Sequence, residues 1–306
     1  KEHGWKGALL VTDQGLMSVG RAKPNIDGFK AEGMNIGVYD KVVPNPTITN
    51  IEEGLKLYHD SKCDVIIALG GGSPMDCAKG IGARVARPDK PIPKMKGILR
   101  VLKQLPPLVA IPTTSGTGSE ATLAAVISNP DTHEKYPIND PVLIPRYAVM
   151  DPLLTVGLPK HITSTTGMDA LTHAVEAYIG SENTSATKKN AIAATQLIFK
   201  YLKRAYDDGQ DKEARNKMQE ASLLAGMAFT RAYVGYVHAV AHSLGGFYGV
   251  PHGLANAVIL PHVLDAYGKK AYKKLARLAE AVGIEGADDE AKAKKFIQEI
   301  KDMNAY

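Results

Sequence analysis

A change of hydrophobic pattern near the middle of the 306-residue chain limits its possible folds more than any other feature. Before Pro152, short apolar runs rich in Val, Ile and Leu alternate with stretches of helical pattern; the runs occupy residues 8–13, 34–40, 64–72, 107–114 and 147–151. Each run is apolar almost throughout and ends in Asp, Gly or Thr. Such runs are typical of parallel strands that are covered on both faces. We therefore expect an open α/β sheet in the first half of the chain.

Beyond Pro152, long segments with a helical period replace these runs. One helix is predicted to end near Gly209, and others are predicted to cover residues 212–232, 236–246, 252–267 and 270–282. The second half should therefore be all α-helical, and the chain should form two domains, residues 1–154 and 155–306. The last segment contains no helix-stop signal, so we expect a fragment that is truncated at its C-terminus.

The composition, with 44% hydrophobic and 23% charged residues, is that of an ordinary globular protein. The net charge of +5 is dispersed, so we interpret the lysines near residue 270 as a solvated helix face rather than a nucleic-acid site. Cys63 and Cys77 have neither CxxC nor zinc-type spacing, which favours a reducing compartment. No segment resembles a secretory leader or approaches the ~20 apolar residues of a membrane span. We therefore expect a cytoplasmic protein with neither nucleic-acid nor membrane partners.

Two loops at predicted strand ends are candidate phosphate-binding segments, because ligands of parallel sheets bind beyond the carboxyl ends of the strands. The first loop contains Gly71, Gly72 and Ser73 and leads directly into a helical pattern. Its glycines let the backbone approach a pyrophosphate, and the helix N-terminus directs N–H groups toward it. The loop completes neither GxGxxG nor GK[ST], so a tight turn that binds nothing remains an alternative.

The second loop contains Thr113, Thr114 and Thr117 and also follows an apolar run. Its hydroxyl groups suit hydrogen bonds to phosphate or ribose, with a helix cap rich in Ser and Thr as the alternative. Asp13, at the end of the first run, is placed to accept hydrogen bonds from a ribose diol and to repel a 2′-phosphate. This position predicts NAD rather than NADP, and a helix-capping aspartate is again the alternative.

Histidines are concentrated in the helical half. Four of the nine fall within 25 residues: His238, His242, His252 and His262. Asp169 and His173 are four residues apart and hence on one helix face, as are His238 and His242. A buried carboxylate near several imidazoles requires a cation or a hydrogen-bond network. We therefore predict a metal site, and its nitrogen and oxygen donors suit Fe(II) or Zn(II).

The chain contains four motifs in this order: GGGSPMDCAKGI, PPLVAIPTTSGTGSE, TTGMDALTHAVEAY and VHAVAHSLGGFYGVPHGLANAVILPHVL. With them, the chain resembles the iron-containing (group III) alcohol dehydrogenases from about Ala8 to Leu264. This family has an N-terminal α/β domain that binds a dinucleotide and a helical C-terminal domain that binds the metal. The resemblance implies that residues 1–154 bind NAD and that residues 155–306 bind the metal.

The resemblance also implies roles for individual residues. Four match the family's metal ligands: Asp169, His173, His238 and His252. Nine match cofactor-contacting positions or their neighbours: Asp13, Gly71, Gly72, Ser73, Thr113, Thr114, Thr117, Lys135 and Leu154. His242 matches a catalytic histidine that lies beside the metal and the nicotinamide. The implied reaction is hydride transfer between NAD and a small primary alcohol or diol, or its aldehyde, in a homodimer with Fe(II) or Zn(II).

Alternatives remain at this point. Glycerol dehydrogenase and dehydroquinate synthase share the two-domain plan and use zinc, and a metal-dependent hydrolase would bind substrate phosphate in the same loops. A catalytically silent NAD-binding fragment is a further possibility. His242 either relays a proton, for which an imidazole pKa of about 6.5 is suitable, or supports the neighbouring ligand His238. The sequence does not specify the alcohol.

Overall fold

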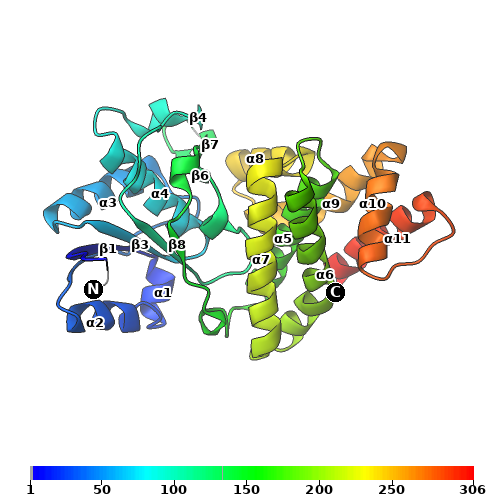
Figure 1. Ribbon diagram of the computed structural model, residues 1–306, viewed down its shortest axis with the longest axis horizontal. Helices are drawn as coiled ribbons and strands as arrows, with labels where there is room; N and C mark the ends of the chain where they lie inside the picture. Colours follow the sequence, from blue (N-terminus) through cyan, green and yellow to red (C-terminus); the bar gives the residue numbers. More distant parts are fainter. Residues whose placement is uncertain (1–2, 133) are drawn as a thin grey trace. The chain divides into compact units, whose positions relative to one another are not determined.

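The computed structural model describes residues 3–132 and 134–306 and divides into two compact units (Figure 1). The first unit comprises the described residues of Lys1–Thr113 and of Ser119–Leu154. The second comprises Thr114–Gly118 and Thr155–Tyr306. Among the described residues, no helix combines the length and the apolar character needed to cross a membrane.

A five-stranded sheet with the order β2-β1-β3-β5-β8 lies at the centre of the first unit. Its strands are β1 (Gly7–Val11), β2 (Asn35–Tyr39), β3 (Val65–Gly70), β5 (Leu108–Pro112) and β8 (Tyr147–Ala148). Every neighbouring pair in this sheet is parallel. Each apolar run of the sequence overlaps one of these strands, so the expected open α/β sheet is confirmed.

The strand order reverses at β1, because β2 lies on one side of β1 and β3 lies on the other. In open α/β sheets, ligands bind beyond the carboxyl ends of the strands at such a switch point. Asp13 follows β1, and Gly71 follows β3. Two of the predicted cofactor-binding positions therefore lie at the switch point of this sheet.

Helices cover both faces of the five-stranded sheet. They are α1 (Gln14–Ser18), α2 (Lys23–Ala31), α3 (Ile48–Asp60) and α4 (Gly72–Ala86). Because successive strand residues point to opposite faces, Leu9 enters the core beneath α3 and α4, whereas Leu10 enters the core with Phe29 of α2. Burial on both faces explains why the strands read as uninterrupted apolar runs.

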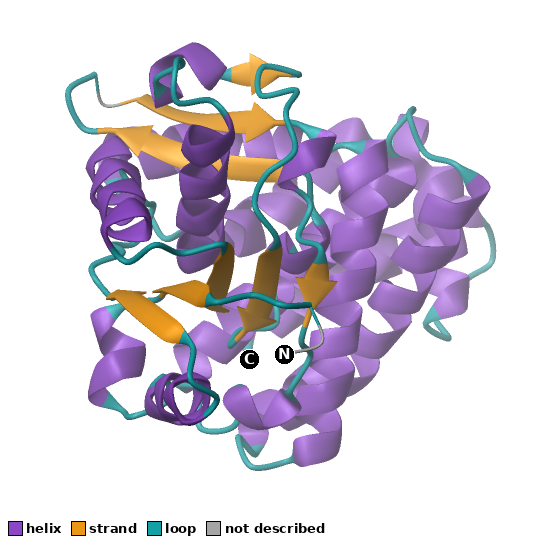
Figure 2. Cartoon of the chain, turned by 60° about the vertical axis from the view of Figure 1, so that its left-hand side comes forward, coloured by secondary structure: helices purple, strands orange, loops and turns teal. Residues whose placement is uncertain are grey.

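A second, smaller sheet was not predicted. It has the order β4-β7-β6 and consists of β4 (Gly97–Ile98), β7 (Glu134–Asn139) and β6 (Ala124–Asn129). Figure 2 shows α3 and α4 between this sheet and the parallel one, and its Ile127 and Ile138 complete their hydrophobic core. The antiparallel pairing of β6 with β7 fixes the position of Lys135, one of the predicted cofactor neighbours.

The second unit is built from α-helices throughout, as expected from the periodicity. They are α5 (Lys160–Ile179), α6 (Ser185–Asp207), α7 (Lys212–Ala232), α8 (Tyr236–Tyr248), α9 (His252–Tyr267), α10 (Lys269–Ala281) and α11 (Asp289–Ala305). The bounds of α7 and α9 coincide with the predicted ranges 212–232 and 252–267.

Helix α5 forms the centre of this unit and packs against α6, α7 and α9. Most of its residues are buried, and small side chains such as Ala174, Ala194 and Ala225 let the neighbouring helices approach closely. The helix is therefore a rigid support from which water is excluded. Any polar side chain on its buried surface requires a partner.

Candidate metal centre and cofactor-binding loops

Three ionisable side chains project from one face of α5: Asp169, His173 and Glu176. Their exposed fractions are only 2%, 4% and 2%. Burying such groups costs free energy unless each is paired or binds a cation. Their partners come from α8 and α9.

Helix α8 contributes His238, which is also buried. Its Nδ1 lies 2.6 Å from Oε2 of Glu176. The backbone N–H groups of Gly235 and Val237 donate to the same carboxylate at 2.9 Å and 2.8 Å. Because the N-cap residue Gly235 has no side chain, Glu176 satisfies the first N–H groups of α8 and stabilises the positive end of its dipole.

Helix α9 begins with His252, directly after Pro251. The next residue, Gly253, lies so close to α5 that an added Cβ would be 2.5 Å from the backbone oxygen of Thr165. Only glycine fits this close approach. The start of α9, and with it His252, is therefore held against the helix that carries Asp169.

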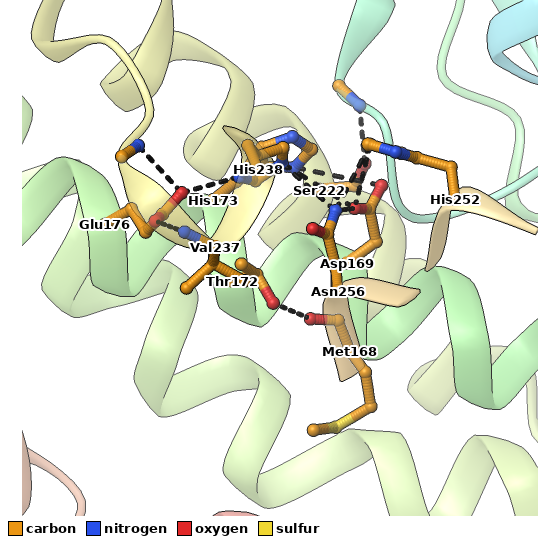
Figure 3. Close-up of polar contacts among 12 residues, drawn as sticks. Met168, Asp169, Thr172, His173, Glu176, Ser222, Val237, His238, His252 and Asn256 are labelled. Carbon is orange, nitrogen blue, oxygen red and sulfur yellow. Dashed lines mark hydrogen bonds and ion pairs between the residues drawn. The ribbon is translucent and has the colours of Figure 1, made fainter. Parts of the chain in front are cut away.

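Asn256 lies one turn further along α9 and is completely buried. Its Nδ2 donates to Oδ1 of Asp169 at 2.6 Å and lies 3.2 Å from Nε2 of both His238 and His252. Figure 3 shows these side chains converging from α5, α8 and α9.

The four predicted ligands, Asp169, His173, His238 and His252, meet in this cluster, with one ligand atom each and all four atoms within 4.8 Å of one another. From Oδ1 of Asp169, Nε2 of His252 is 3.5 Å away and Nε2 of His238 is 3.9 Å away. Nδ1 of His173 lies 4.0 Å from Oδ2 of the same carboxylate. The structure thus places side chains from three helices around one point.

The charge state of the cluster suits a divalent cation. Burial raises the pKa of Asp169, but the surrounding histidines and the hydrogen bond from Asn256 outweigh it and hold the pKa at about 2. Burial lowers the pKa of His173 and, more strongly, that of His238, so both imidazoles are neutral at pH 7 and each keeps a lone pair. Nδ1 of His173 has no hydrogen-bond partner among the described residues. A cation held by these nitrogen and oxygen donors would satisfy it.

The other two clustered histidines occupy different positions. The His242 ring lies beside the centre, with its centroid 6.1 Å from that of His238 and 5.2 Å from that of His252. His242 is not one of the four converging donors. His262 is exposed on α9. It follows His252 by ten residues, which turns it to another face of the helix.

Sequence analysis did not identify Glu176 or Asn256. Their spacing carried a signal, because Glu176 follows Asp169 by seven residues and Asn256 follows His252 by four. Both separations return to the same helix face. Neither separation shows which neighbouring helix that face meets.

In the first unit, the loop between β3 and α4 holds three predicted cofactor residues. Gly71 is the N-cap of α4, and no side chain of this N-cap satisfies the first N–H groups of the helix. Gly70 has a φ of 154°, and an added Cβ would lie 2.5 Å from Cγ of Pro74. The loop therefore needs glycine at this turn, and its helix start is suited to an anion.

Asn45 connects two of the predicted cofactor positions and was not identified from the sequence. Its backbone N–H donates to Oγ of Ser73 at 3.2 Å. Its Oδ1 accepts a 2.7 Å hydrogen bond from Nζ of Lys135. With a φ of 59°, Asn45 adopts the left-handed conformation that asparagine tolerates. Ser73 and Lys135, predicted separately, are thus brought together.

The second loop is divided between the units. Thr113 donates its N–H to the Gly70 carbonyl at 3.0 Å within the first unit. The loop's next residues, Thr114–Gly118, belong to the helical unit, where a Cβ on Gly116 would lie 2.6 Å from Cβ of Thr166 on α5. The glycine at this position allows close packing on α5. Thr114 and Thr117 remain the cofactor candidates of this segment.

The last two predicted cofactor residues have structural contacts of their own. Oδ1 of Asp13 accepts a 2.9 Å hydrogen bond from the backbone N–H of Leu16 and thereby caps α1. Leu154 packs against the hydrophobic cluster that contains Ile111. The ribose contact of Asp13 and the cofactor contact of Leu154 stay predictions.

Comparison with known proteins shows the relationships of the chain. Two family models match it: "Iron-containing alcohol dehydrogenase" over residues 1–152 and "Fe-containing alcohol dehydrogenase family, C-terminal" over residues 163–306. The chain is 44% identical to 1,3-propanediol dehydrogenase of Klebsiella pneumoniae over 92% of this chain and 73% of that protein. It is 42% identical to alcohol dehydrogenase 4 of Schizosaccharomyces pombe over 99% of this chain and 72% of that protein. A crystal structure of 1,3-propanediol oxidoreductase superimposes with a TM-score of 0.95 at 42% identity, covering 99% of this chain and 79% of that one.

Proposed function

Because the chain belongs to the iron-containing alcohol dehydrogenase family, we propose that it oxidises a small primary alcohol or diol, or reduces the matching aldehyde, with NAD as the hydride carrier. The observation that carries this proposal is the convergence of one carboxylate and three imidazoles on a single point. We assign Fe(II) to these four donors: Asp169, His173, His238 and His252. Zn(II), the alternative from the sequence, shares their donor preference.

The residues of the centre have separable tasks in this reaction. A bound divalent cation would supply Lewis acidity that lowers the pKa of an alcohol hydroxyl. Asp169 supplies the negative charge that retains a cation, and its pKa of about 2 keeps it ionised near neutral pH. His173 and His238 bind as neutral donors because burial lowers their pKa values. The surrounding helices exclude water, which strengthens each of these interactions.

The proposed NAD site is supported by the topology of the sheet. The helix start at Gly71 and Gly72 offers N–H groups to a pyrophosphate, and Asp13 stands across the switch point at the end of β1. The segment Thr114–Gly118, which carries two candidate cofactor contacts, packs on α5 at Thr166, one turn before Asp169. A cofactor bound by Thr114 and Thr117 would thus be bound by a loop that packs on α5, the helix that carries Asp169 and His173.

We assign proton transfer to His242, whose ring lies beside those of His238 and His252 without joining the donor set. An imidazole is suited to carry a proton near neutral pH. A His242→Ala variant should keep its metal and lose the pH dependence of turnover. If that variant retains full activity with the wild-type pH profile, His242 does not carry the proton.

The decisive experiment measures NADH formation by protein purified without oxygen and supplied with Fe(II). Substrates to compare are ethanol, butanol, 1,2-propanediol and 1,3-propanediol, with lactaldehyde in the reverse direction. His252→Ala should lose metal and turnover but retain NAD affinity. His262→Ala, a substitution of an exposed histidine on the same helix, should retain all three and is the matched control. Hydrolysis of a phosphate ester without NADH formation would instead support the metal-dependent hydrolase.

The homodimer implied by the family resemblance and the cytoplasmic location expected from the cysteines and the N-terminal sequence stay predictions. Light scattering of the purified protein tests the first.

A further inference from the structure

Glu176 makes contacts that its role as a helix cap alone does not require. Three groups lie within hydrogen-bond distance of its carboxylate oxygens: the backbone N–H of Gly235, the backbone N–H of Val237 and Nδ1 of His238. The exposed fraction of Glu176 is 2%, so these contacts are made out of reach of bulk water. In a buried site, a donor left without an acceptor destabilises the fold.

These contacts determine which nitrogen of His238 carries the proton. Each oxygen of the Glu176 carboxylate already accepts a backbone N–H group, Oε2 from Gly235 and Oε1 from Val237, and this arrangement favours a further donor, Nδ1 of His238, at Oε2. The opposite side of the ring gives the same answer independently. Nδ2 of Asn256 carries two hydrogens; one goes to Oδ1 of Asp169, and Nε2 of His238 lies 3.2 Å from the same N–H₂ group. A hydrogen on Nε2 of His238 would point at this donor group, so Nε2 holds a lone pair.

The lone pair of His238 is therefore directed at the other ligand atoms. Nε2 lies 3.9 Å from Oδ1 of Asp169, on the side of the ring opposite Glu176. Glu176 and Asp169 stand on the same face of α5, so one rigid helix fixes both the ligand carboxylate and the orientation of the imidazole.

The backbone before α8 is strained in a way that serves this arrangement. Tyr233 has a φ of 63° and a ψ of −176°, a strained backbone conformation that residues other than glycine rarely adopt. Two residues later, a Cβ on Gly235 would lie 2.8 Å from Oε1 of Glu176. The backbone of this turn is strained at Tyr233, and Gly235 has no side chain. Both features let the N–H groups of Gly235 and Val237 reach Glu176.

We propose that Glu176 is a positioning residue of the metal centre, which holds His238 as the Nδ1–H tautomer with its Nε2 lone pair toward Asp169. The proposal rests on the metal site of the proposed function, and it adds a second buried carboxylate that acts on the cation through His238. Carboxylate partners of this kind raise the basicity of the imidazole and fix its direction.

The first test is the tautomer itself. Nitrogen NMR of the protein labelled with ¹⁵N-histidine, with the His238 signals assigned by their loss in His238→Gln, should show Nδ1 protonated and Nε2 unprotonated. The measurement is made on wild-type protein treated with chelator and needs no Glu176 variant. Protonation at Nε2 instead would overturn the proposal.

The second test measures metal affinity by chelator competition. Glu176→Gln has nearly the same shape, but one oxygen becomes an N–H₂ donor, so it cannot accept from all three groups at once. We expect its affinity for Fe(II) and Zn(II) to fall about 10–100-fold and the His238 tautomer to reverse. NAD affinity should not change. Glu182→Gln, an exposed glutamate just after α5, is the matched control and should bind metal as the wild type does.

The outcomes separate this proposal from the proposed function. Unchanged metal affinity and tautomer in a folded Glu176→Gln protein would refute the positioning role, while NADH formation from alcohols would still stand. If Glu176→Gln does not fold, Gly235→Ala provides a second variant, because its Cβ displaces the carboxylate without changing its charge. That variant should also weaken metal binding, and wild-type affinity in it would contradict the proposal. A wild-type protein that binds neither metal would contradict the proposed function, and the positioning role, which rests on it, would fail with it.

Discussion

Replacing Lys79 with methionine should destabilise the first unit strongly. The side chain is completely buried on α4, and its Nζ, with three N–H donors, lies 2.8–3.0 Å from four acceptors: Oγ of Ser119, O and Oγ1 of Thr122, and the carbonyl of Ala124. Burial lowers the pKa of Lys79 to about 8, so it is still mainly charged at pH 7. The substitution removes this charge next to Asp76, which also accepts from Ser119.

The expected loss is about 3–5 kcal/mol, the cost of removing one of two interacting buried groups, Lys79 and Asp76. For a unit of this size, this corresponds to a decrease of roughly 10–15 °C in Tm. Urea denaturation and calorimetry measure it, with Lys23→Met, an exposed lysine on α2, as the control that should change stability little. Because Lys79 joins α4 to the segment after the threonine loop, NAD affinity should fall as well. A loss below about 1 kcal/mol would refute the reasoning.

Three further predictions follow from single sites. Burial raises the pKa of Glu120 to about 7, so the folded protein retains a proton that the unfolded chain releases above its ordinary value of 4.5. Stability should therefore fall by up to about 3 kcal/mol as the pH rises between these values, and denaturation of Glu120→Gln across that range should lack this component. In Asn256→Asp, a carboxylate would replace the amide whose Nδ2 lies 2.6 Å from Oδ1 of Asp169. A bound cation would then offset the repulsion between the two carboxylates, so saturating Zn(II) should raise the Tm of the variant, measured against its Tm in chelator, by more than it raises the Tm of the wild type. Equal increases would contradict this. Gly226→Ala in α7 should destabilise the fold, because its Cβ would lie 2.7 Å from the backbone oxygen of Gly118. Gly246→Ala in α8 would meet nothing within 4 Å and should stabilise the fold by about 1 kcal/mol. Thermal unfolding of both variants checks that the two changes in stability have opposite signs.

The elements that sequence analysis located best have local signals at both ends. Helix α7 begins after Asp211, whose side chain accepts from the N–H of Ala214, and α9 ends at Gly268 with a φ of 51°. A few adjacent residues determine such helix starts and ends. The parallel strands were equally easy to predict from the sequence, because burial on both faces requires an unbroken apolar run.

The small sheet could not be located in this way. Strand β7 contains Pro137, which argues against a strand because proline cannot donate to a neighbouring strand. Its residues are only alternately buried, and its stability comes from packing on α3 and α4. The pairing with β6 is therefore a property of the folded unit rather than of the segment.

The candidate metal centre was predictable in its candidate ligands and not in the residues that support them. Asp169 with His173, and His238 with His242, have helical spacing and indicate a metal site by their chemistry. The family resemblance implied the set of four that includes His252. Glu176 and Asn256 are ordinary helix residues by sequence, and their roles arise only where α5, α8 and α9 meet. Conversely, His262 has the right chemistry but lies on an exposed face of α9.

The most direct test of the central claim is an anomalous X-ray difference map, recorded at the iron absorption edge, from crystals grown with Fe(II) in the absence of oxygen. We expect a single strong peak bonded to a carboxylate oxygen of Asp169 and to one ring nitrogen each of His173, His238 and His252. A peak at another place, or one from which any of these four side chains points away, would contradict the account.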